Sequence, residues 1–189
     1  MLKISFKILL IILSASLLLV NCKKTANSPK DSIETVTRLK VNNGDISGWA
    51  INTYNVFYSA DSWAANGVDG TAYGLQNTHT YSEVMDEHMN GSNGATVTVW
   101  VLNYTTTANS TEQYDVSKTM YSSNAESLSP DFPDSVAIGN NSSTSGISVY
   151  THFKQFYIEL HFAGYTDFSL SKTDAIIFLQ LFEAEINGN

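Results

Sequence analysis

The sequence has one cysteine, Cys22, three prolines, and only ten basic residues against 18 acidic ones. A lone cysteine has no intramolecular disulfide partner, so no disulfide framework supports the fold. From Val41 onward there are three lysines and 16 acidic residues, a net side-chain charge of −13. Because nucleic-acid affinity depends on Lys and Arg neutralising phosphates, we expect no nucleic-acid partner.

Motifs that carry well-known chemistry are also missing. The sequence contains no G-x-S-x-G nucleophile elbow, no GxGxxG, no P-loop and no CxxC. We therefore expect no cofactor and no catalytic residue, and the leading hypothesis for the function is non-catalytic.

The first 22 residues have the three zones of an export signal. Lys3 and Lys7 precede an apolar or small stretch of 13 residues, Ile8 to Val20. A helix needs about 20 residues to cross a bilayer, so this stretch is too short to span comfortably. The pattern predicts a signal peptide over residues 1–21.

The residues Leu19, Val20, Asn21 and Cys22 resemble a lipobox, in which the thiol receives diacylglycerol and becomes the new N-terminus. We predict lipidation of Cys22, with palmitate among the acyl chains, and a lipid-anchored place in the bacterial envelope, at the outer membrane or cell surface. Asn21 stands where Gly, Ala or Ser is usual. An uncleaved N-terminal anchor and secretion with a free thiol therefore remain alternatives.

Residues 22–45 lack apolar periodicity, which predicts a flexible tether after the lipid site. Ile33, Val36 and Leu39 are spaced by three, and one or two helical turns packed on the domain would explain them equally. The remaining residues 46–189 have the usual length of one domain.

Within this domain, alternation predicts strands over Trp49–Tyr58, within Tyr73–Met89, and over Ala95–Tyr104. A short helix is expected over Ser59–Asn66, and capping boxes at Asn109, Ser110, Glu112 and Gln113 predict a helix over Thr111–Ser122. A loop over Ser123–Asp134, a short strand over Ser135–Gly139 and a loop over residues 140–146 should follow.

Ile147 to Phe162 predicts a hairpin that turns near Lys154 and Gln155, with one apolar and one polar face. A final helix should span Thr173–Ile186, started by Ser171. Together these elements predict an α+β fold, in which an antiparallel sheet of about five or six strands packs on two or three helices.

Several of these segments carry a resemblance. Gly48-Trp49, Asp61-Ser62-Trp63 before Asn66-Gly67, Tyr73-Gly74-Leu75, and the Val-rich strand before a capped helix resemble a family of bacterial lipoprotein domains of unknown function. The resemblance covers about residues 46–121. It implies the fold and the envelope location, and it transfers no catalytic residue.

The polar face of the expected hairpin carries the strongest candidates for chemistry. His152, Glu159 and His161 are transition-metal ligands that would lie near one another. On the expected pairing, however, His152 faces Tyr157 and His161 faces Ser148. Solvent-facing or helix-covered polar residues explain the same pattern, so we assign no metal site.

Three other groups of residues could have either a functional or a structural role. Asp61, Asn66 and Asp69 could bind calcium or only form turns. Glu83, Asp86 and Glu87 could pair as glycosidase carboxylates or be solvated surface. The aromatic residues could form a ligand groove or fill the core; they include Trp49, Trp63 and Trp100.

The sequence thus predicts a membrane-anchored envelope lipoprotein with a binding or structural role and an unknown ligand, whether protein or glycan. The alternatives are a hydrolase that uses a metal or paired carboxylates, and a carrier of a lipid or other hydrophobic ligand.

Overall fold

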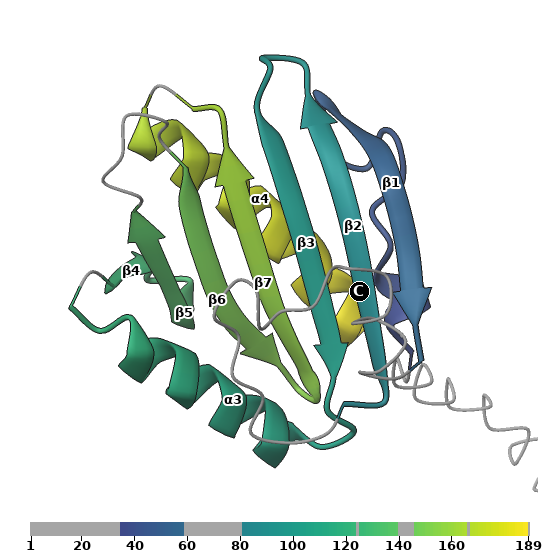
Figure 1. The fold of residues 1–189 in the computed structure, drawn as a ribbon, viewed down its shortest axis with the longest axis vertical. Coiled ribbons are helices and arrows are strands. Elements are labelled where there is room, and N and C mark those ends of the chain that lie inside the picture. The colour runs from purple at the N-terminus through teal and green to yellow at the C-terminus, as the bar shows by residue number, and fades with distance from the viewer. Residues whose placement is uncertain (1–34, 59–80, 124, 140–145, 166, 189) are drawn as a thin grey trace, which may run out of the picture. The chain divides into compact units, whose positions relative to one another are not determined.

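A computed structural model describes residues 35–58, 81–123, 125–139, 146–165 and 167–188. These residues form one antiparallel sheet of seven strands in the order β1-β2-β3-β7-β6-β5-β4. The sheet joins two meanders, because β3 pairs with the distant strand β7 (Figure 1). The elements are η1 Val36–Leu39 (a 3₁₀ helix), β1 Trp49–Phe57, β2 Glu83–Gly91, β3 Thr96–Asn103, α3 Thr107–Met120, β4 Ala125–Ser129, β5 Phe132–Gly139, β6 Ile147–Phe153, β7 Phe156–Ala163 and α4 Phe168–Asn187.

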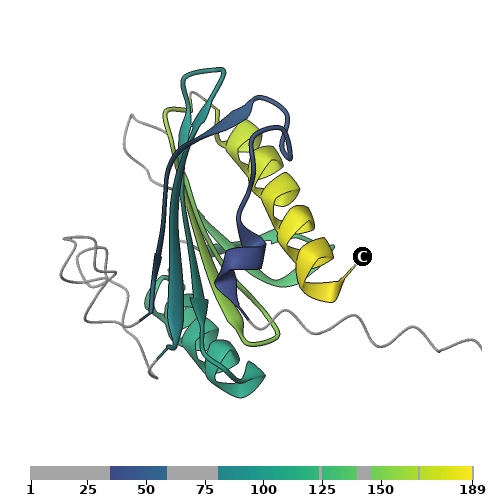
Figure 2. The ribbon, with the colours of Figure 1, turned by 90° about the vertical axis from the view of Figure 1, so that its right-hand side faces the viewer.

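One face of the sheet packs on α4 and η1, and the other face packs on α3 (Figure 2). The α4 side holds the larger core, which the odd-numbered residues of β3 and the even-numbered residues of β7 enter. Trp49 contacts Phe178 and Phe162 edge to face there, with ring centroids 5.4 and 6.0 Å apart. This layer buries the apolar face that the hairpin pattern predicts.

The α3 side holds a smaller core that is rich in tyrosine. Its buried members include Trp100, Tyr104, Tyr114, Tyr150 and Tyr157. The polar face of the hairpin is therefore covered where α3 contacts β6 and β7. Since these rings carry hydroxyl or N–H groups, this layer is built around hydrogen bonds as well as apolar contact.

The predicted fold class is correct, but the sheet has seven strands rather than five or six. The additional strand is β4, which lies in the segment predicted as a loop, and β5 also begins earlier than predicted. β4 is an edge strand with polar, exposed residues such as Glu126 and Ser127. Its backbone pairing with β5 does not depend on an apolar pattern. The described residues contain two α-helices, at the lower limit of the expected number.

Both helices begin earlier than the predicted caps. Thr106 caps α3, because its Oγ1 accepts a hydrogen bond from the Asn109 amide at 3.2 Å. Asp167 caps α4 by accepting from the Ser169 amide at 2.8 Å. The chain offers several Ser, Thr and Asp residues near each start, and any of them can cap a helix.

The domain also begins before residue 46. Val36, Leu39 and Val41 are buried in the core of the α4 side, so part of the segment predicted as a tether is packed. The alternative reading of Val36 and Leu39 as a packed helical turn is correct for η1. Of the described helices, none is long and apolar enough to cross a membrane.

Candidate binding site on the sheet

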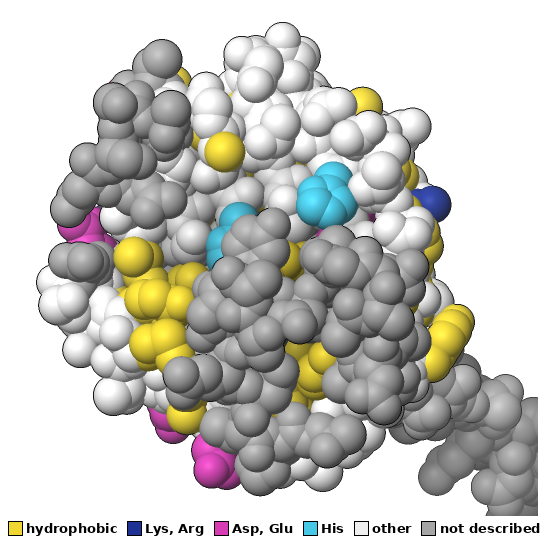
Figure 3. Space-filling view, in the orientation of Figure 1, with side chains coloured by type: hydrophobic (Ala, Val, Ile, Leu, Met, Phe, Trp, Pro, Cys, Tyr) yellow, Lys and Arg dark blue, Asp and Glu magenta, His cyan; other side chains and the backbone are white. Residues whose placement is uncertain are grey.

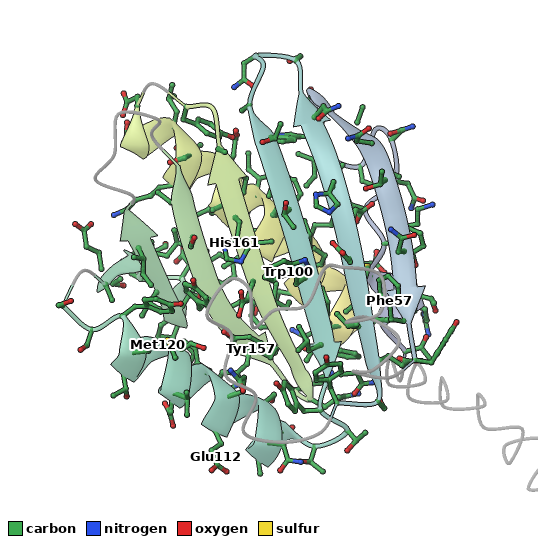
Figure 4. The ribbon with its side chains drawn as sticks, in the orientation of Figure 1. Phe57, Trp100, Glu112, Met120, Tyr157 and His161 are labelled. Atoms are coloured by element: carbon green, nitrogen blue, oxygen red, sulfur yellow. The ribbon has the colours of Figure 1, made fainter. Side chains whose placement is uncertain are left out.

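A hollow of about 420 Å³ lies on the α3 side of the sheet, beyond the end of α3. Its floor comes from four neighbouring strands, β3, β7, β6 and β5, and Tyr121 closes it at the C-terminal end of α3. Its lining residues are Thr96, Thr98, Trp100, Tyr121, Ile138, Ser148, Tyr150, His161, Phe162 and Ala163. Trp100 and His161 lie side by side at the centre of this face (Figure 4), with ring centroids 4.9 Å apart.

The strand register sets one row of side chains across β2, β3, β7 and β6, of which Trp100 and Tyr150 line the hollow. Asp86 on β2 is the partner of Trp100 on β3, which is the partner of Glu159 on β7, and Glu159 is the partner of Tyr150 on β6. The Trp100 Nε1 donates to Asp86 Oδ1 at 3.0 Å. Both carboxylates are almost fully buried, with exposed fractions of 1% for Asp86 and 2% for Glu159.

The next row contains two histidines with the same surroundings. His88 Nε2 lies 3.1 Å from Asp86 Oδ1, and its Nδ1 lies 3.0 Å from Thr98 Oγ1. His161 Nε2 lies 2.9 Å from Glu159 Oε2, and its Nδ1 lies 2.9 Å from Ser148 Oγ. Each histidine thus joins a carboxylate two residues earlier on its own strand to a hydroxyl on the adjacent strand.

The Glu159 network continues beneath α3. Tyr157 donates to Glu159 Oε1 at 2.9 Å, and its hydroxyl lies 2.6 Å from Ser117 Oγ on α3. Burial, followed by the charge of Glu159, raises the pKa values of Tyr157 and Tyr150 well above their usual range. Both tyrosines therefore remain neutral phenols, and the Tyr157 hydroxyl serves as a donor to the carboxylate.

The Ser148–His161–Glu159 chain has the residue order of a nucleophilic triad. Acyl transfer also needs backbone N–H groups aimed at the developing oxyanion. Ser148 and His161 lie within β6 and β7, and each of these strands pairs with a neighbour on both sides. The sheet ladder therefore uses the amides of these two strands.

The three metal candidates do not come together. Glu159 and His161 are in direct contact, but His152 lies under α3, where its Nδ1 is 3.5 Å from Thr111 Oγ1 and its ring packs on Tyr114. Burial lowers the pKa of His152. Within the described ranges, no three His, Cys, Asp or Glu side chains are grouped so that they could hold a metal ion.

The three residues that could have supplied paired carboxylates are divided between the two faces of β2. Asp86 points to the hollow side, whereas Glu83 and Glu87 point to the α4 side and accept hydrogen bonds from the amides of Val36 and Val41. Burial raises the pKa of Glu87 to about 7. Asp86 therefore shares a face of β2 with neither glutamate, and the three residues do not form one cluster of carboxylates.

The remaining candidates lie in the core, in the hollow or outside the described residues. Trp49 is a core residue of the α4 side, whereas Trp100 lines the hollow. Cys22, Trp63 and the calcium candidates Asp61, Asn66 and Asp69 lie outside the described residues.

Sequence reasoning missed Asp86–His88 as a pair, and with it the symmetry of the site. A usable signal was present, because Asp86-Glu87-His88 and Glu159-Leu160-His161 both place an acid and a histidine two residues apart. On a strand, this spacing puts both side chains on one face.

No family model matches the chain, and no curated protein matches it. Among solved structures, the fold is similar to the crystal structure of the extracellular domain of PknH from Mycobacterium tuberculosis. The TM-score is 0.57 at 8% sequence identity, and the match covers 86% of this chain and 99% of that domain. The comparison supports an α+β domain built on the same sheet architecture, and at this identity the likeness concerns the fold alone.

Proposed function

We propose that this chain is a lipid-anchored envelope protein whose domain binds a small ligand, without catalysis, in the hollow formed by β3, β7, β6 and β5. The observation that carries the proposal is the hollow itself. Its volume of about 420 Å³ is within the range of about 300–1,000 Å³ that ligand pockets occupy. It combines aromatic rings with hydroxyl and imidazole groups, the mixture that gives a pocket both affinity and orientation.

The two buried carboxylates support binding by fixing the side chains that line the hollow. Asp86 holds the indole of Trp100, and Glu159 holds the imidazole of His161. A site whose rings are held before the ligand arrives loses less conformational entropy on binding. The structure of the chain's first 34 residues is not described, so the anchor rests on the sequence around Cys22.

The lining of the hollow also bears on the two alternative functions that the sequence left open. A hydrolase would use the Ser148–His161–Glu159 chain, and a hydrophobic-ligand carrier would need a mostly apolar cavity. The lining is mixed, because the hydroxyls of Thr96, Thr98 and Ser148 lie among apolar and aromatic side chains. A ligand with both polar and apolar parts fits it better than a lipid tail, which would leave these hydroxyls without a partner in the ligand.

The experiment is a thermal melt of the full chain in a maltoside detergent against neutral sugars, anions, amines and lipids. Ligand at 100 times its Kd should stabilise the protein by about 2.7 kcal/mol, which raises Tm by several degrees. His161→Gln should abolish the rise, whereas the control His152→Gln should retain it, because His152 is not among the lining residues. Identical responses of both variants to every ligand, or ester turnover that Ser148→Ala abolishes, would contradict the proposal.

A further inference from the structure

The described lining of the hollow carries no permanent positive charge. Of its described lining residues, none is a lysine or arginine. The four lysines of the described chain have contacts elsewhere: Lys40 over the Tyr54 ring, Lys118 over the Tyr114 ring, Lys154 on the Ile186 carbonyl, and Lys172 on Glu126. In Figure 3, histidine side chains lie near the centre of this face, and Lys or Arg is visible only at its edge.

Two acidic side chains lie beside lining residues of the hollow without lining it themselves. Asp86 and Glu159 flank Trp100 on the two adjacent strands, and both are buried. Among the described residues, their partners are the His88 and His161 imidazoles, the Trp100 N–H and the Tyr157 hydroxyl. None of these groups carries a permanent positive charge. Burial is the main cause of the raised pKa of Tyr150, a lining residue, and the charge of Glu159 raises it further.

Aromatic rings complete the surroundings. Tyr121 and Tyr150 stack with centroids 5.2 Å apart at 22°, and Trp100 lines the same hollow. The faces of such rings carry negative electrostatic potential, so they attract cations and are used to recognise quaternary ammonium groups. Buried carboxylates behind the rings add to this attraction, because a charge is weakly screened where water is excluded.

We infer that the hollow binds a small organic cation, a quaternary or protonated amine, seated against Trp100, Tyr121 and Tyr150 with Asp86 and Glu159 as buried counter-charges. This inference rests on the proposed function and specifies its ligand class. Thr98 and Ser148 both pair with His161 in the strand register and line the hollow. Besides its contact with a histidine, each hydroxyl has capacity for a further hydrogen bond to a polar group of the ligand.

The test compares choline with 3,3-dimethyl-1-butanol, which has the same shape and no charge. Both are titrated calorimetrically into the full chain in a maltoside detergent, with ionic strength held constant by NaCl. We expect choline to bind at least about tenfold more tightly, since a desolvated cation–π contact and its counter-charge are together worth about 1.4 kcal/mol or more. Equal affinity for the two compounds, or a choline response no larger than that of NaCl, overturns the inference.

Three variants test which residues cause the preference for choline. Glu159→Gln and Asp86→Asn should each reduce the preference for choline severalfold, and Tyr121→Leu should weaken choline binding without touching a buried carboxylate. The matched control is Glu87→Gln, because Glu87 neighbours Asp86 but points to the opposite face of β2. If all three site variants keep the full preference, or if Glu87→Gln removes it, the inference is wrong.

The outcomes also separate this inference from the proposed function. If a neutral sugar or an anion binds through His161 and amines give no response, the ligand is not a cation. Ligand binding in the hollow would still stand. No response to any ligand class would overturn both.

Discussion

Asp86 and Glu159 are placed symmetrically about Trp100: each lies opposite it in the strand register, one on β2 and the other on β7. Each carboxylate binds the histidine two residues later on its own strand, His88 or His161. A buried carboxylate costs several kcal/mol unless hydrogen bonds compensate it. The two networks should therefore hold Trp100 and His161 rigidly, and the Glu159 network extends through Tyr157 to Ser117 on α3.

Tyr157→Phe should lower the free energy of unfolding by about 1–3 kcal/mol, the usual cost of leaving a buried polar group unsatisfied. The variant removes the donor to Glu159 Oε1 and the partner of Ser117 Oγ, while the ring remains in its fully buried place. Urea unfolding measures the change. The control is Tyr58→Phe, whose ring is 69% exposed and whose loss of a hydroxyl should cost less than about 0.5 kcal/mol. Equal effects of the two variants would show that the Ser117–Tyr157–Glu159 chain contributes nothing to stability.

Glu87 should make the protein less stable as the pH rises from about 4.5 to about 7. Burial raises its folded-state pKa from 4.5 to about 7, so the folded state holds a proton that the unfolded state has already lost in this range. The stability from this proton is fully present below the unfolded pKa and is lost as pH rises through the folded pKa. The loss is at most about 3 kcal/mol, at 1.36 kcal/mol per pKa unit.

The measurement is urea unfolding of Glu87→Gln and of wild type at pH 5 and pH 8. Gln cannot ionise, so the variant should gain stability relative to wild type at pH 8 and show a smaller difference at pH 5. Glu185→Gln, at an exposed position on α4, is the control and should track the wild type. If the difference in free energy of unfolding between Glu87→Gln and wild type is the same at pH 5 and pH 8, the assignment of this proton to Glu87 is wrong.

The sequence could predict those parts of the fold that an alternating pattern specifies. β3 and the β6–β7 hairpin are confirmed with their faces and their turn at Lys154 and Gln155, because one face of each strand enters the α4-side core. β4 could not be recognised, since an edge strand is held by backbone pairing and its side chains are largely exposed. The helix starts were missed because several nearby residues are equally able to cap.

The candidate site was predicted only in part. Glu159 and His161 were correctly placed near each other on the polar face of the hairpin, because the period of a strand fixes which side chains share a face. The sequence did not indicate that Asp86, Trp100 and Thr98 lie beside these two residues. The pairing of β3 with β7 brings together segments about 60 residues apart in the chain. Local patterns do not encode such long-range pairing.

Leu39→Ala should destabilise the domain by about 2–5 kcal/mol, the range for removing a large buried aliphatic side chain. Leu39 is 1% exposed on η1 and belongs to the same core as Phe178. The adjacent Arg38 is exposed, so Arg38→Ala is the matched control and should change stability by less than about 0.5 kcal/mol. Chemical unfolding of both variants decides the domain boundary: if Leu39→Ala behaves like Arg38→Ala, η1 belongs to the tether and not to the folded domain.

Cys22→Ala should release the protein from the membrane fraction and abolish its metabolic labelling with palmitate. The thiol is the only one in the chain, so lipid attached through sulfur has no other site. Two or more acyl chains anchor a protein stably because each buried CH₂ contributes about 0.8 kcal/mol. Asn21→Ala is the informative control, since it keeps the thiol and restores the small residue usual before it; this variant should stay labelled and membrane-bound. Persistent labelling in Cys22→Ala would refute the lipid anchor. Membrane association without labelling would instead identify the apolar stretch Ile8–Val20 as an uncleaved anchor.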